Sequence, residues 1–371
     1  MDKSLLITTG HQHRYIYSDA LRCFLYVPEK MVALIERKDV MATDKDDYYV
    51  RKLHFLEKHG FFEKRETVFQ TNYPEELVKR NIAGLRQLLI EVTDRCNLEC
   101  EYCGYGKFYS NYDKRENNDQ SFDNVKLLID YLVPLWCSDY NTSHGNVVTI
   151  GFYGGEPLLN MKLVKETINY VESLKLSNLT FSYNTTTNAM LLNRYMDYLV
   201  EKDFHLLVSL DGGEHQSGYR VDKHGKPSFS RVIENVRKLK ETYPDYFEKR
   251  VNFNSVLHNL NSAEECYSFI YGLFGKSPRI AQLNITGLIP ERSEEFSKMF
   301  NDRVNSFDAA LLHEDLKEAF IMEDSHSVNY HSMLMRYIGN RYANYLDLFD
   351  TCWEDRYIPT GTCRPFERKL F

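Results

Sequence analysis

The strongest constraint on the fold is an alternation, from about residue 86 onward, of apolar runs typical of strands with amphipathic stretches typical of helices, at intervals of roughly 25 to 40 residues. The apolar runs predict strands over Leu88–Val92, Val147–Phe152, Leu179–Asn184, His205–Leu210, Val251–Leu257 and Gln282–Leu288. The stretches between them predict helices over Phe122–Trp136, Lys162–Leu174, Leu192–Glu201, Phe229–Thr242 and Ser262–Phe274. Six strand–helix units fit an open, partial barrel better than a closed barrel of about eight. We therefore expect an α/β fold with a partial (β/α)6 TIM-like barrel, whose chemistry lies at the carboxyl ends of the strands.

The two ends of the chain differ from this pattern. The length of 371 residues allows two or three domains at roughly 150 residues each. Residues 1–85 predict a β-hairpin that runs into a helix, and then a second helix that ends at Gly60, which suggests a small winged-helix-like module. We assign residues 86–290 to the partial barrel and residues 291–371 to a short, helical C-terminal extension.

Composition excludes several classes of function. The chain has 46 basic and 53 acidic residues, and the net charge of −7 disfavours a nucleic-acid partner or an anionic membrane surface. No apolar run approaches the roughly 18 residues that cross a bilayer, and the first residues lack a signal-peptide core. We therefore expect a cytoplasmic protein with no nucleic-acid or membrane partner, whose eight cysteines stay reduced.

Three of these cysteines lie close together in the segment TDRCNLECEYCGYG, directly after the first predicted strand. Cys96, Cys100 and Cys103 form a C-x3-C-x2-C pattern. Three thiolates on one loop can each bind one iron of a cubane [4Fe–4S] cluster, which leaves the fourth iron without a protein ligand. The alternatives are three ordinary buried thiols or a zinc site, although zinc prefers a fourth ligand and none is nearby.

With these residues the chain resembles the radical S-adenosylmethionine (SAM) superfamily. In that superfamily a C-x3-C-x-Φ-C loop holds the cluster that cleaves SAM reductively, and Tyr102 occupies the aromatic Φ position here. The resemblance implies one [4Fe–4S] cluster and SAM as cofactors, with Tyr102 beside them. It also implies an electron donor such as flavodoxin or ferredoxin.

A second motif follows the second predicted strand, where Gly154, Gly155, Glu156 and Pro157 spell GGEP. Glycines admit a ligand close to the backbone, proline stiffens a turn, and a carboxylate accepts hydrogen bonds from an ammonium group. By itself GGEP is typical of an ordinary turn. After a cysteine loop it matches the superfamily motif that binds the amino group of SAM, which implies the same role here.

Two later strand ends also resemble superfamily motifs. The turn TTNA contains Thr187 and Asn188, and it matches a T-N-G-like turn near the SAM ribose, with alanine in place of the usual glycine. The segment SLDG contains Ser209 and Asp211, and it resembles a motif of the peptide and protein maturases in the superfamily. The resemblance implies that these four residues contribute to SAM binding.

Arg220 aligns with the arginine that usually meets the SAM carboxylate, and a guanidinium suits a carboxylate because it can bind both oxygens. The chain departs from the pattern just before it. The usual His-Asp pair is Gln216-Ser217 here, and the loop is one residue shorter. A role that depends on that pair is therefore not carried over.

Both ends of the chain bear on the substrate. The segment around Cys363 resembles the opening of a SPASM domain, which holds auxiliary clusters, but no cysteine follows it and only Cys352 precedes it nearby. We therefore expect a single cluster. The N-terminal module resembles the elements with which peptide maturases bind a leader segment by adding it as a strand, although a purely shielding domain is an equal alternative.

The resemblance implies a radical SAM, peptide-modifying oxidoreductase. Such an enzyme cleaves SAM to a 5′-deoxyadenosyl radical, which abstracts hydrogen from a ribosomally made precursor peptide and leads to a thioether, C–C or C–O cross-link. The alternatives are protein modification of the anaerobic sulfatase-maturase kind and a non-catalytic peptide-binding scaffold. An iron–sulfur electron carrier would not need the barrel. The sequence names no catalytic acid or base.

Overall fold

The computed structural model describes residues 4–8, 12–18, 23–36, 48–63, 68–69, 75–110, 115–141, 147–177, 179–313, 316, 356–357 and 369–370. These residues form two compact units. Unit 1 contains the described residues up to Tyr73 and strand β11 (Arg356–Tyr357). Unit 2 contains those from Pro74 to residue 316 and strand β12 (Lys369–Leu370).

Unit 2 is built on a parallel sheet with the strand order β10-β9-β8-β7-β6-β5-β12. Its first six strands in chain order are β5 (Gln87–Thr93), β6 (Val147–Gly154), β7 (Thr180–Thr187), β8 (His205–Ser209), β9 (Val251–Leu257) and β10 (Arg279–Gln282). All neighbouring strands in this sheet pair in parallel. The predicted α/β fold with an open, six-stranded partial barrel is therefore confirmed. The added strand β12 pairs with the outer edge of β5.

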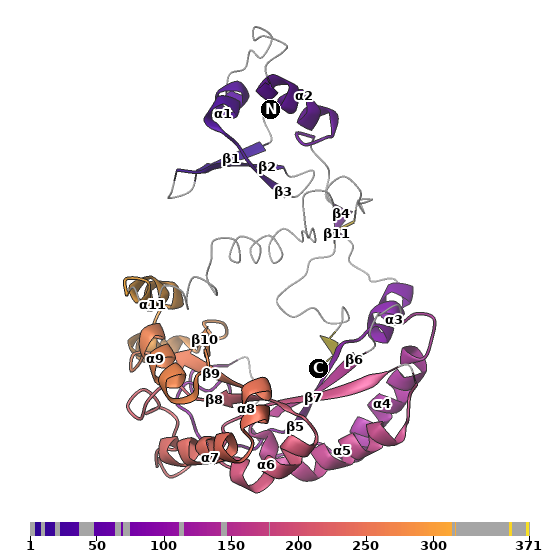
Figure 1. The fold of residues 1–371 in the computed structure, drawn as a ribbon, viewed down its shortest axis with the longest axis vertical. Coiled ribbons are helices and arrows are strands. Elements are labelled where there is room, and N and C mark those ends of the chain that lie inside the picture. The colour runs from indigo at the N-terminus through magenta and orange to yellow at the C-terminus, as the bar shows by residue number, and fades with distance from the viewer. Residues whose placement is uncertain are drawn as a thin grey trace. The chain divides into compact units, whose positions relative to one another are not determined.

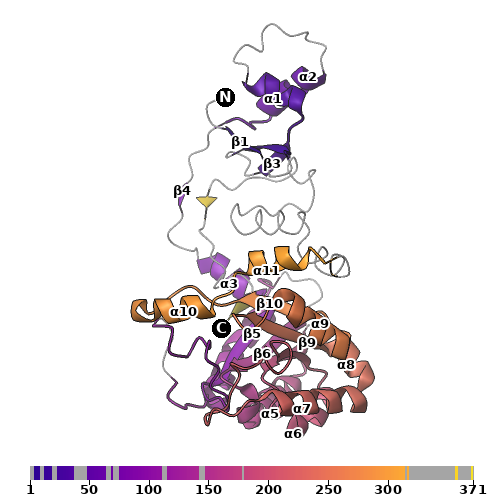
Figure 2. The same cartoon turned by 90° about the vertical axis from the view of Figure 1, so that its left-hand side faces the viewer.

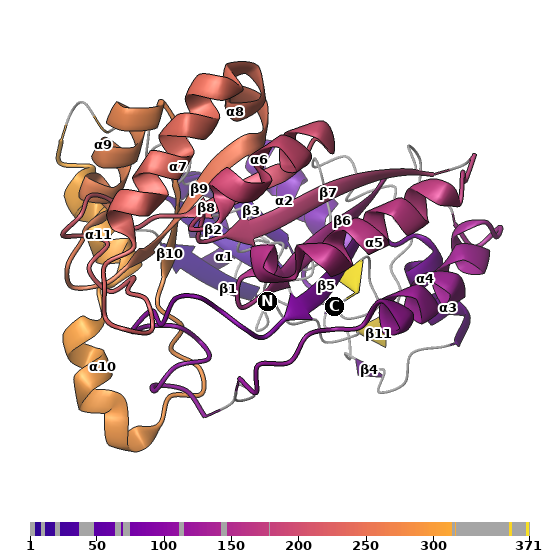
Figure 3. The same ribbon diagram turned by 90° about the horizontal axis from the view of Figure 1, so that it is seen from below.

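Helices follow the strands along the convex side of this sheet (Figures 1 and 3). They are α4 (Phe122–Trp136), α5 (Met161–Ser173), α6 (Leu192–Glu201), α7 (Phe229–Thr242), α8 (Pro244–Arg250) and α9 (Ala263–Phe274). Unit 2 also contains α3 (Glu75–Ala83), which precedes β5, and α10 (Ser293–Met299) and α11 (Arg303–Ala310), which follow β10. Short 3-10 turns span Pro157–Asn160 and Pro290–Arg292. Within the described residues, no helix has the length and apolar character of a transmembrane segment.

One core joins the sheet to helices α4 to α9. Buried strand residues such as Leu88 and Ile150 pack against buried helix residues such as Ile129, Ile168 and Leu199. These residues recur at the helical and strand periods that predict the elements, because each element buries one face. The carboxyl ends of the strands are thereby fixed on a rigid sheet, and the loops that follow them carry the predicted motifs.

The structure differs from the prediction at the sixth strand. The strand spans Arg279–Gln282, whereas the sequence predicts Gln282–Leu288. Beyond Gln282, the Asn284 side chain accepts a hydrogen bond from the backbone N–H of Thr286 at 3.0 Å, and Gly287 has a φ of 75°. The chain therefore turns where the β-branched residues predict extension. The short helix α8 is also absent from the prediction.

Unit 1 contains an antiparallel sheet of β1 (Ser4–Thr8), β2 (Arg14–Ser18) and β3 (Cys23–Tyr26), in that order. Helices α1 (Glu29–Glu36) and α2 (Tyr48–Lys58) lie on one face of it, as Figure 2 shows. Ile16, Met31 and Leu53 form the centre of their shared core. The predicted hairpin and both helices are present, whereas β1 is an additional strand. Strand β4 (Val68–Phe69) pairs in parallel with β11.

Candidate functional site

The cysteine loop leaves the carboxyl end of β5 and is fixed by backbone hydrogen bonds. The N–H groups of Glu99 and Glu101 donate to the carbonyl oxygens of Val221 and Tyr219, at 2.8 and 3.2 Å. Within the loop, the Cys103 N–H donates to the Cys100 carbonyl oxygen at 3.0 Å. The loop after β5 therefore lies against the segment after β8, although more than one hundred residues separate them in sequence.

The three cysteines of this loop are free and partly buried. Burial raises the pKa of Cys100 to about 11, the charge of Arg220 opposes this, and Cys103 and Cys96 add to it. The three sulfurs are thus close enough to interact electrostatically. In the described part of the chain, no three His, Cys, Asp or Glu side chains converge as ligands of one metal ion. A cubane does not require such convergence, because each thiolate binds a different iron.

Hydrogen-bond donors around the sulfurs test whether the loop suits a cluster of thiolates. Arg115 Nη2 donates to Cys103 Sγ at 3.3 Å, while the Leu98 N–H and Asn188 Nδ2 donate to Cys96 Sγ at 3.4 and 3.7 Å. In addition, Arg115 Nε is buried without a hydrogen-bond partner among the described residues. Donors and a positive charge stabilise thiolates, so the residues present fit a [4Fe–4S] cluster on Cys96, Cys100 and Cys103.

The backbone of the GGEP turn passes close to the backbone at the start of the cysteine loop. The N–H groups of Gly155 and Glu156 donate to the carbonyl oxygens of Thr93 and Arg95, each at 2.8 Å. A Cβ atom on Gly154 would lie 2.1 Å from the Thr93 oxygen, and one on Gly155 would lie 2.2 Å from the Arg95 oxygen. The two glycines are therefore required for contact between the loops, a reason that differs from the predicted ligand approach.

The Glu156 carboxylate lies inside this crossing and is 1% exposed. It accepts hydrogen bonds from Thr187 Oγ1 at 2.7 Å, from the Asn188 N–H at 2.7 Å and from the Leu158 N–H at 3.1 Å. Burial raises the pKa of Glu156, and these donors limit the rise. Glu156 therefore joins the loops after β6 and β7. Its neighbour Pro157 is also buried and begins a 3-10 turn.

The turn after β7 is ordered by its own side chains. Asn188 Nδ2 donates to Asn97 Oδ1 at 2.8 Å, and Asn188 Oδ1 accepts from the Met190 N–H at 3.0 Å. Ala189 has a φ of 57°, in the left-handed region where glycine is favoured. This conformation explains why a glycine suits the position in a T-N-G-like turn. The amide of Asn188 points toward the cysteine loop.

Beneath the cysteine loop lies a buried charge network. Asp211 Oδ2 accepts a hydrogen bond from the Tyr102 hydroxyl and lies 3.6 Å from Arg220 Nη1, which also donates to the Tyr102 oxygen at 2.6 Å. Burial alone would raise the pKa of Asp211, but Arg220 and nearby donors outweigh burial and hold it below its ordinary value. Burial also raises the pKa of Tyr102 well above its ordinary value. The network thus holds an ionised Asp211 beside Arg220.

Sequence reasoning missed two members of this network, His258 and Asn261. His258 is fully buried, stacks on the Tyr102 ring with 5.6 Å between centroids, and places Nε2 3.8 Å from Asp211 Oδ2. Its Nδ1 accepts from the Leu260 N–H at 3.2 Å, so the ring proton lies on Nε2, the nitrogen that faces Asp211. Asn261 Nδ2 donates to the Asp211 carbonyl oxygen at 3.1 Å. The sequence signal that could have identified both residues is their position directly after the predicted strand Val251–Leu257.

The remaining predicted positions either lie at the edge of this site or fall outside the residues that the structure describes. Ser209 ends β8, where it pairs with Asn254 of β9. Gln216 Nε2 donates to Glu265 Oε1 at 3.0 Å, and the buried Ser217 hydroxyl donates to the Gly212 carbonyl oxygen at 3.2 Å. Cys352 and Cys363 lie outside the described residues.

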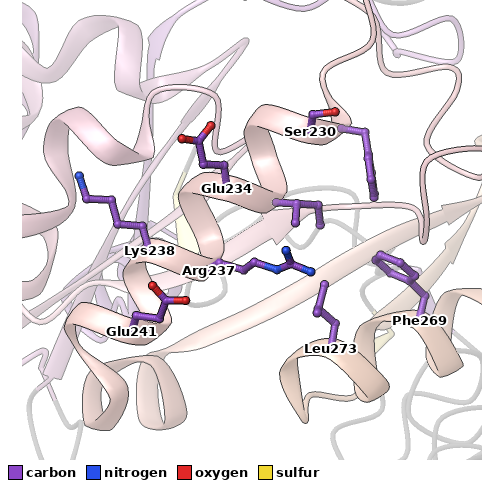
Figure 4. Close-up of a pocket in the computed structure, with 9 residues that line it drawn as sticks. Ser230, Glu234, Arg237, Lys238, Glu241, Phe269 and Leu273 are labelled. Carbon is purple, nitrogen blue, oxygen red and sulfur yellow. The ribbon is translucent and has the colours of Figure 1, made fainter.

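A groove of about 720 Å³ lies elsewhere, between α7 and α9 (Figure 4). Its apolar lining includes Phe229, Ile233, Phe269 and Leu273, and charged side chains of α7 form part of its wall. None of its lining residues is a predicted cofactor residue. The groove and the candidate site are therefore separate features.

Comparisons with known proteins agree with this geometry. A family model described as the radical SAM superfamily matches residues 90–270. An uncharacterised protein of Methanocaldococcus jannaschii is 31% identical over 221 residues, which cover 59% of this chain and 68% of that protein. The residues that the family model matches contain part of β5, strands β6 to β9 and every loop of the candidate site.

Two relatives with stated activities match shorter regions. A cysteine-type anaerobic sulfatase-maturating enzyme of Clostridium novyi is 31% identical over 168 residues, which are 44% of this chain and 42% of that enzyme. A radical SAM cyclopropyl synthase of Paramaledivibacter caminithermalis is 23% identical over 184 residues, which are 47% and 35% of the two chains. The chain thus matches less than half the length of either enzyme.

Proposed function

The chain belongs to the radical SAM superfamily, and we propose that it acts on a ribosomally made peptide and forms an intramolecular cross-link in it. Members of the superfamily are enzymes that use a [4Fe–4S] cluster and SAM. The observation that carries the cluster and SAM part of the proposal is that the loops after β6, β7 and β8 meet the loop after β5, whose three thiols are supplied with hydrogen-bond donors.

The residues of these loops divide into two sets. Cys96, Cys100 and Cys103 hold the cluster, and the GGEP and TTNA turns with Ser209, Asp211 and Arg220 surround SAM. When bound, the cluster supplies the electron that cleaves SAM, and the resulting 5′-deoxyadenosyl radical removes hydrogen from a substrate carbon. A fixed, partly buried loop limits the access of water to the thiols.

Arg220 can serve both the charge network and SAM. Among the described residues its side chain donates one hydrogen bond, to Tyr102, and pairs with Asp211. A guanidinium has five N–H donors. Donors therefore remain for the carboxylate of SAM, while Asp211 keeps the guanidinium in place.

A peptide substrate is supported by three features. The SLDG segment resembles a motif of peptide and protein maturases, and the segment around Cys363 resembles the opening of a SPASM domain. Strands β1 and β3 are the two edges of the sheet in unit 1, and a peptide strand can add to such an edge through backbone hydrogen bonds. We propose that unit 1 binds the leader of a precursor peptide in this way, and that flavodoxin or ferredoxin supplies electrons.

A second candidate is oxidation of a sulfatase side chain, because the sulfatase-maturating relative has higher identity than the cyclopropyl synthase. The Gln216-Ser217 pair weighs against this candidate, because it replaces the usual His-Asp pair. Gln216 is instead hydrogen-bonded to Glu265 of α9. Incubation with a sulfatase-derived peptide and with a peptide encoded beside this chain separates the two candidates. Mass spectrometry of both peptides identifies the substrate class, which is that of the peptide whose mass changes.

The test of the proposed function is anaerobic release of 5′-deoxyadenosine from SAM under a strong reductant. We expect release from the reconstituted wild type and none from Cys96→Ala/Cys100→Ala/Cys103→Ala. A matched control is Cys137→Ala, since Cys137 is an exposed cysteine at the end of α4. Equal release from the triple variant and the wild type would refute the cluster assignment.

A further inference from the structure

Arg115 makes an unusual set of contacts beside the cysteine loop. Its Nη2 donates to Cys103 Sγ at 3.3 Å, and the guanidinium carbon lies 4.8 Å from the centroid of the Tyr105 ring. The Tyr105 hydroxyl in turn donates to Glu91 Oε1 on β5 at 2.7 Å. The Arg115 guanidinium is therefore held by the Cys103 sulfur and by the Tyr105 ring, and the ring is in turn fixed to β5.

Two arginines near the cysteine loop differ in how their charge is paired. In the described part of the chain, no Asp or Glu lies within ion-pair distance of Arg115, and its buried Nε lacks a hydrogen-bond partner. Arg95 in the same loop is the opposite case. It binds Asp119 with two hydrogen bonds, of 2.9 and 2.6 Å. The charge of Arg95 is therefore compensated, whereas that of Arg115 acts on the sulfurs.

We propose that Arg115 raises the reduction potential of the [4Fe–4S] cluster by holding its positive charge against the Cys103 sulfur. This inference rests on the cluster assignment of the proposed function. Reduction adds negative charge to a cluster, and both a nearby cation and a hydrogen bond to a ligand sulfur stabilise that charge.

The alternative is that Arg115 only fastens the loop, in which case its removal would change loading or stability but not the potential. The midpoint potential of the reconstituted cluster, measured by redox titration followed by electron paramagnetic resonance without SAM, separates the two. We compare the wild type with Arg115→Gln, Arg115→Lys and the matched control Arg95→Gln/Asp119→Asn, which removes the neighbouring ion pair. Iron and sulfide content are measured for each protein.

We expect Arg115→Gln to shift the midpoint potential to more negative values. At a fixed applied potential the ratio of reduced to oxidised cluster should fall about tenfold, which corresponds to a shift of ~59 mV for one electron. Arg115→Lys keeps the charge and loses the planar fork, so a smaller shift is expected. Arg95→Gln/Asp119→Asn should keep the wild-type potential, because it removes a cation and its paired anion together and leaves the net charge beside the loop unchanged.

An unchanged potential in a fully loaded Arg115→Gln protein would overturn the inference, as would an equal shift in Arg95→Gln/Asp119→Asn. If Arg115→Gln does not load a cluster, Tyr105→Leu decides instead, because it removes the ring that holds the guanidinium. A negative shift in that variant supports the inference, and a wild-type potential overturns it. A wild type that binds no cluster would contradict the proposed function, so the two failures are distinguishable.

Discussion

Asp211 and Arg220 are the charged residues of the site that are most deeply buried together. Their side chains are 0% and 9% exposed, and Arg220 Nη1 lies 3.6 Å from Asp211 Oδ2. Two charges out of water are tolerated only while each compensates the other. Tyr102 and His258 add contacts to the same carboxylate. Removal of one member therefore affects the folded state itself.

We expect Asp211→Asn to lower the free energy of unfolding by about 3–5 kcal/mol, because Arg220 would remain buried without a counter-charge. Denaturant unfolding measures this loss. The matched control is Asp203→Asn. Asp203 pairs with Arg250, but its side chain is 60% exposed, so we expect a loss of at most about 1 kcal/mol. Equal losses for the two variants would contradict the network.

The pH dependence of this loss follows from the pKa of Asp211. Burial would raise that pKa, yet Arg220 and the donors His258 and Tyr102 hold it below the ordinary value of 3.8. A carboxyl group with a lower pKa in the folded chain stabilises the fold above its unfolded pKa and loses this effect as pH falls through its folded pKa. The stability difference between the wild type and Asp211→Asn should therefore be constant from about pH 7 to 5. This difference in stability should shrink only below about pH 3.8, the ordinary pKa of an aspartate side chain.

At the scale of elements, the crossing of the loops after β5 and β6 is the closest backbone contact of the site. Gly154 has a φ of 126°, and a Cβ there would lie 2.1 Å from the Thr93 carbonyl oxygen. We expect Gly154→Ala to cost about 2–4 kcal/mol, since strain and overlap with the backbone add. Gly225→Ala is the control, because Gly225 has a φ of 75° and no atom within 4 Å of such a Cβ. It should cost only about 1 kcal/mol in thermal unfolding.

The start of α9 offers a second test at this scale. The spacing of Ser262 and Glu265 predicts a capping box, and the Ser262 hydroxyl does accept from the Glu265 N–H at 3.2 Å. The Glu265 carboxylate binds Gln216 instead of completing the box. We expect Ser262→Ala to lose about 1 kcal/mol in chemical denaturation. Ser297→Ala, inside α10 on an exposed surface, should change stability by less than about 0.5 kcal/mol. A loss from Ser297→Ala as large as that from Ser262→Ala would argue against the cap.

At the scale of the whole molecule, β12 covers the outer edge of β5. Lys369 pairs with Gln87 and Leu370 with Leu88. An uncovered strand edge presents unpaired backbone groups that promote association. We expect deletion of residues 365–371 to lower stability by about 1–2 kcal/mol and to increase self-association, measured by light scattering. An unchanged association state and stability would show that the pairing contributes nothing in solution.

The sequence alone predicts most elements of unit 2, because each strand and helix carries its own period of apolar residues. The helices α4, α6 and α7 have the predicted bounds. The sixth strand is the exception, since β-branched residues favoured extension where the side chain of Asn284 makes a turn. The motifs lie where predicted, at the carboxyl ends of strands, because parallel strands bring those ends to one edge of the sheet.

What the sequence by itself determined is local: the strand–helix rhythm, the cysteine spacing and the motifs that place the chain in its superfamily. The tertiary structure alone decided which side chains meet. Arg220 bonds to Tyr102 across 118 residues, and Asn188 bonds to Asn97 across 91. Arg115 follows Cys103 by twelve residues in the sequence and donates a hydrogen bond to its sulfur. Such pairs leave no periodic signal, because their partners are set by the packing of loops on a common sheet and by the need to compensate buried charge.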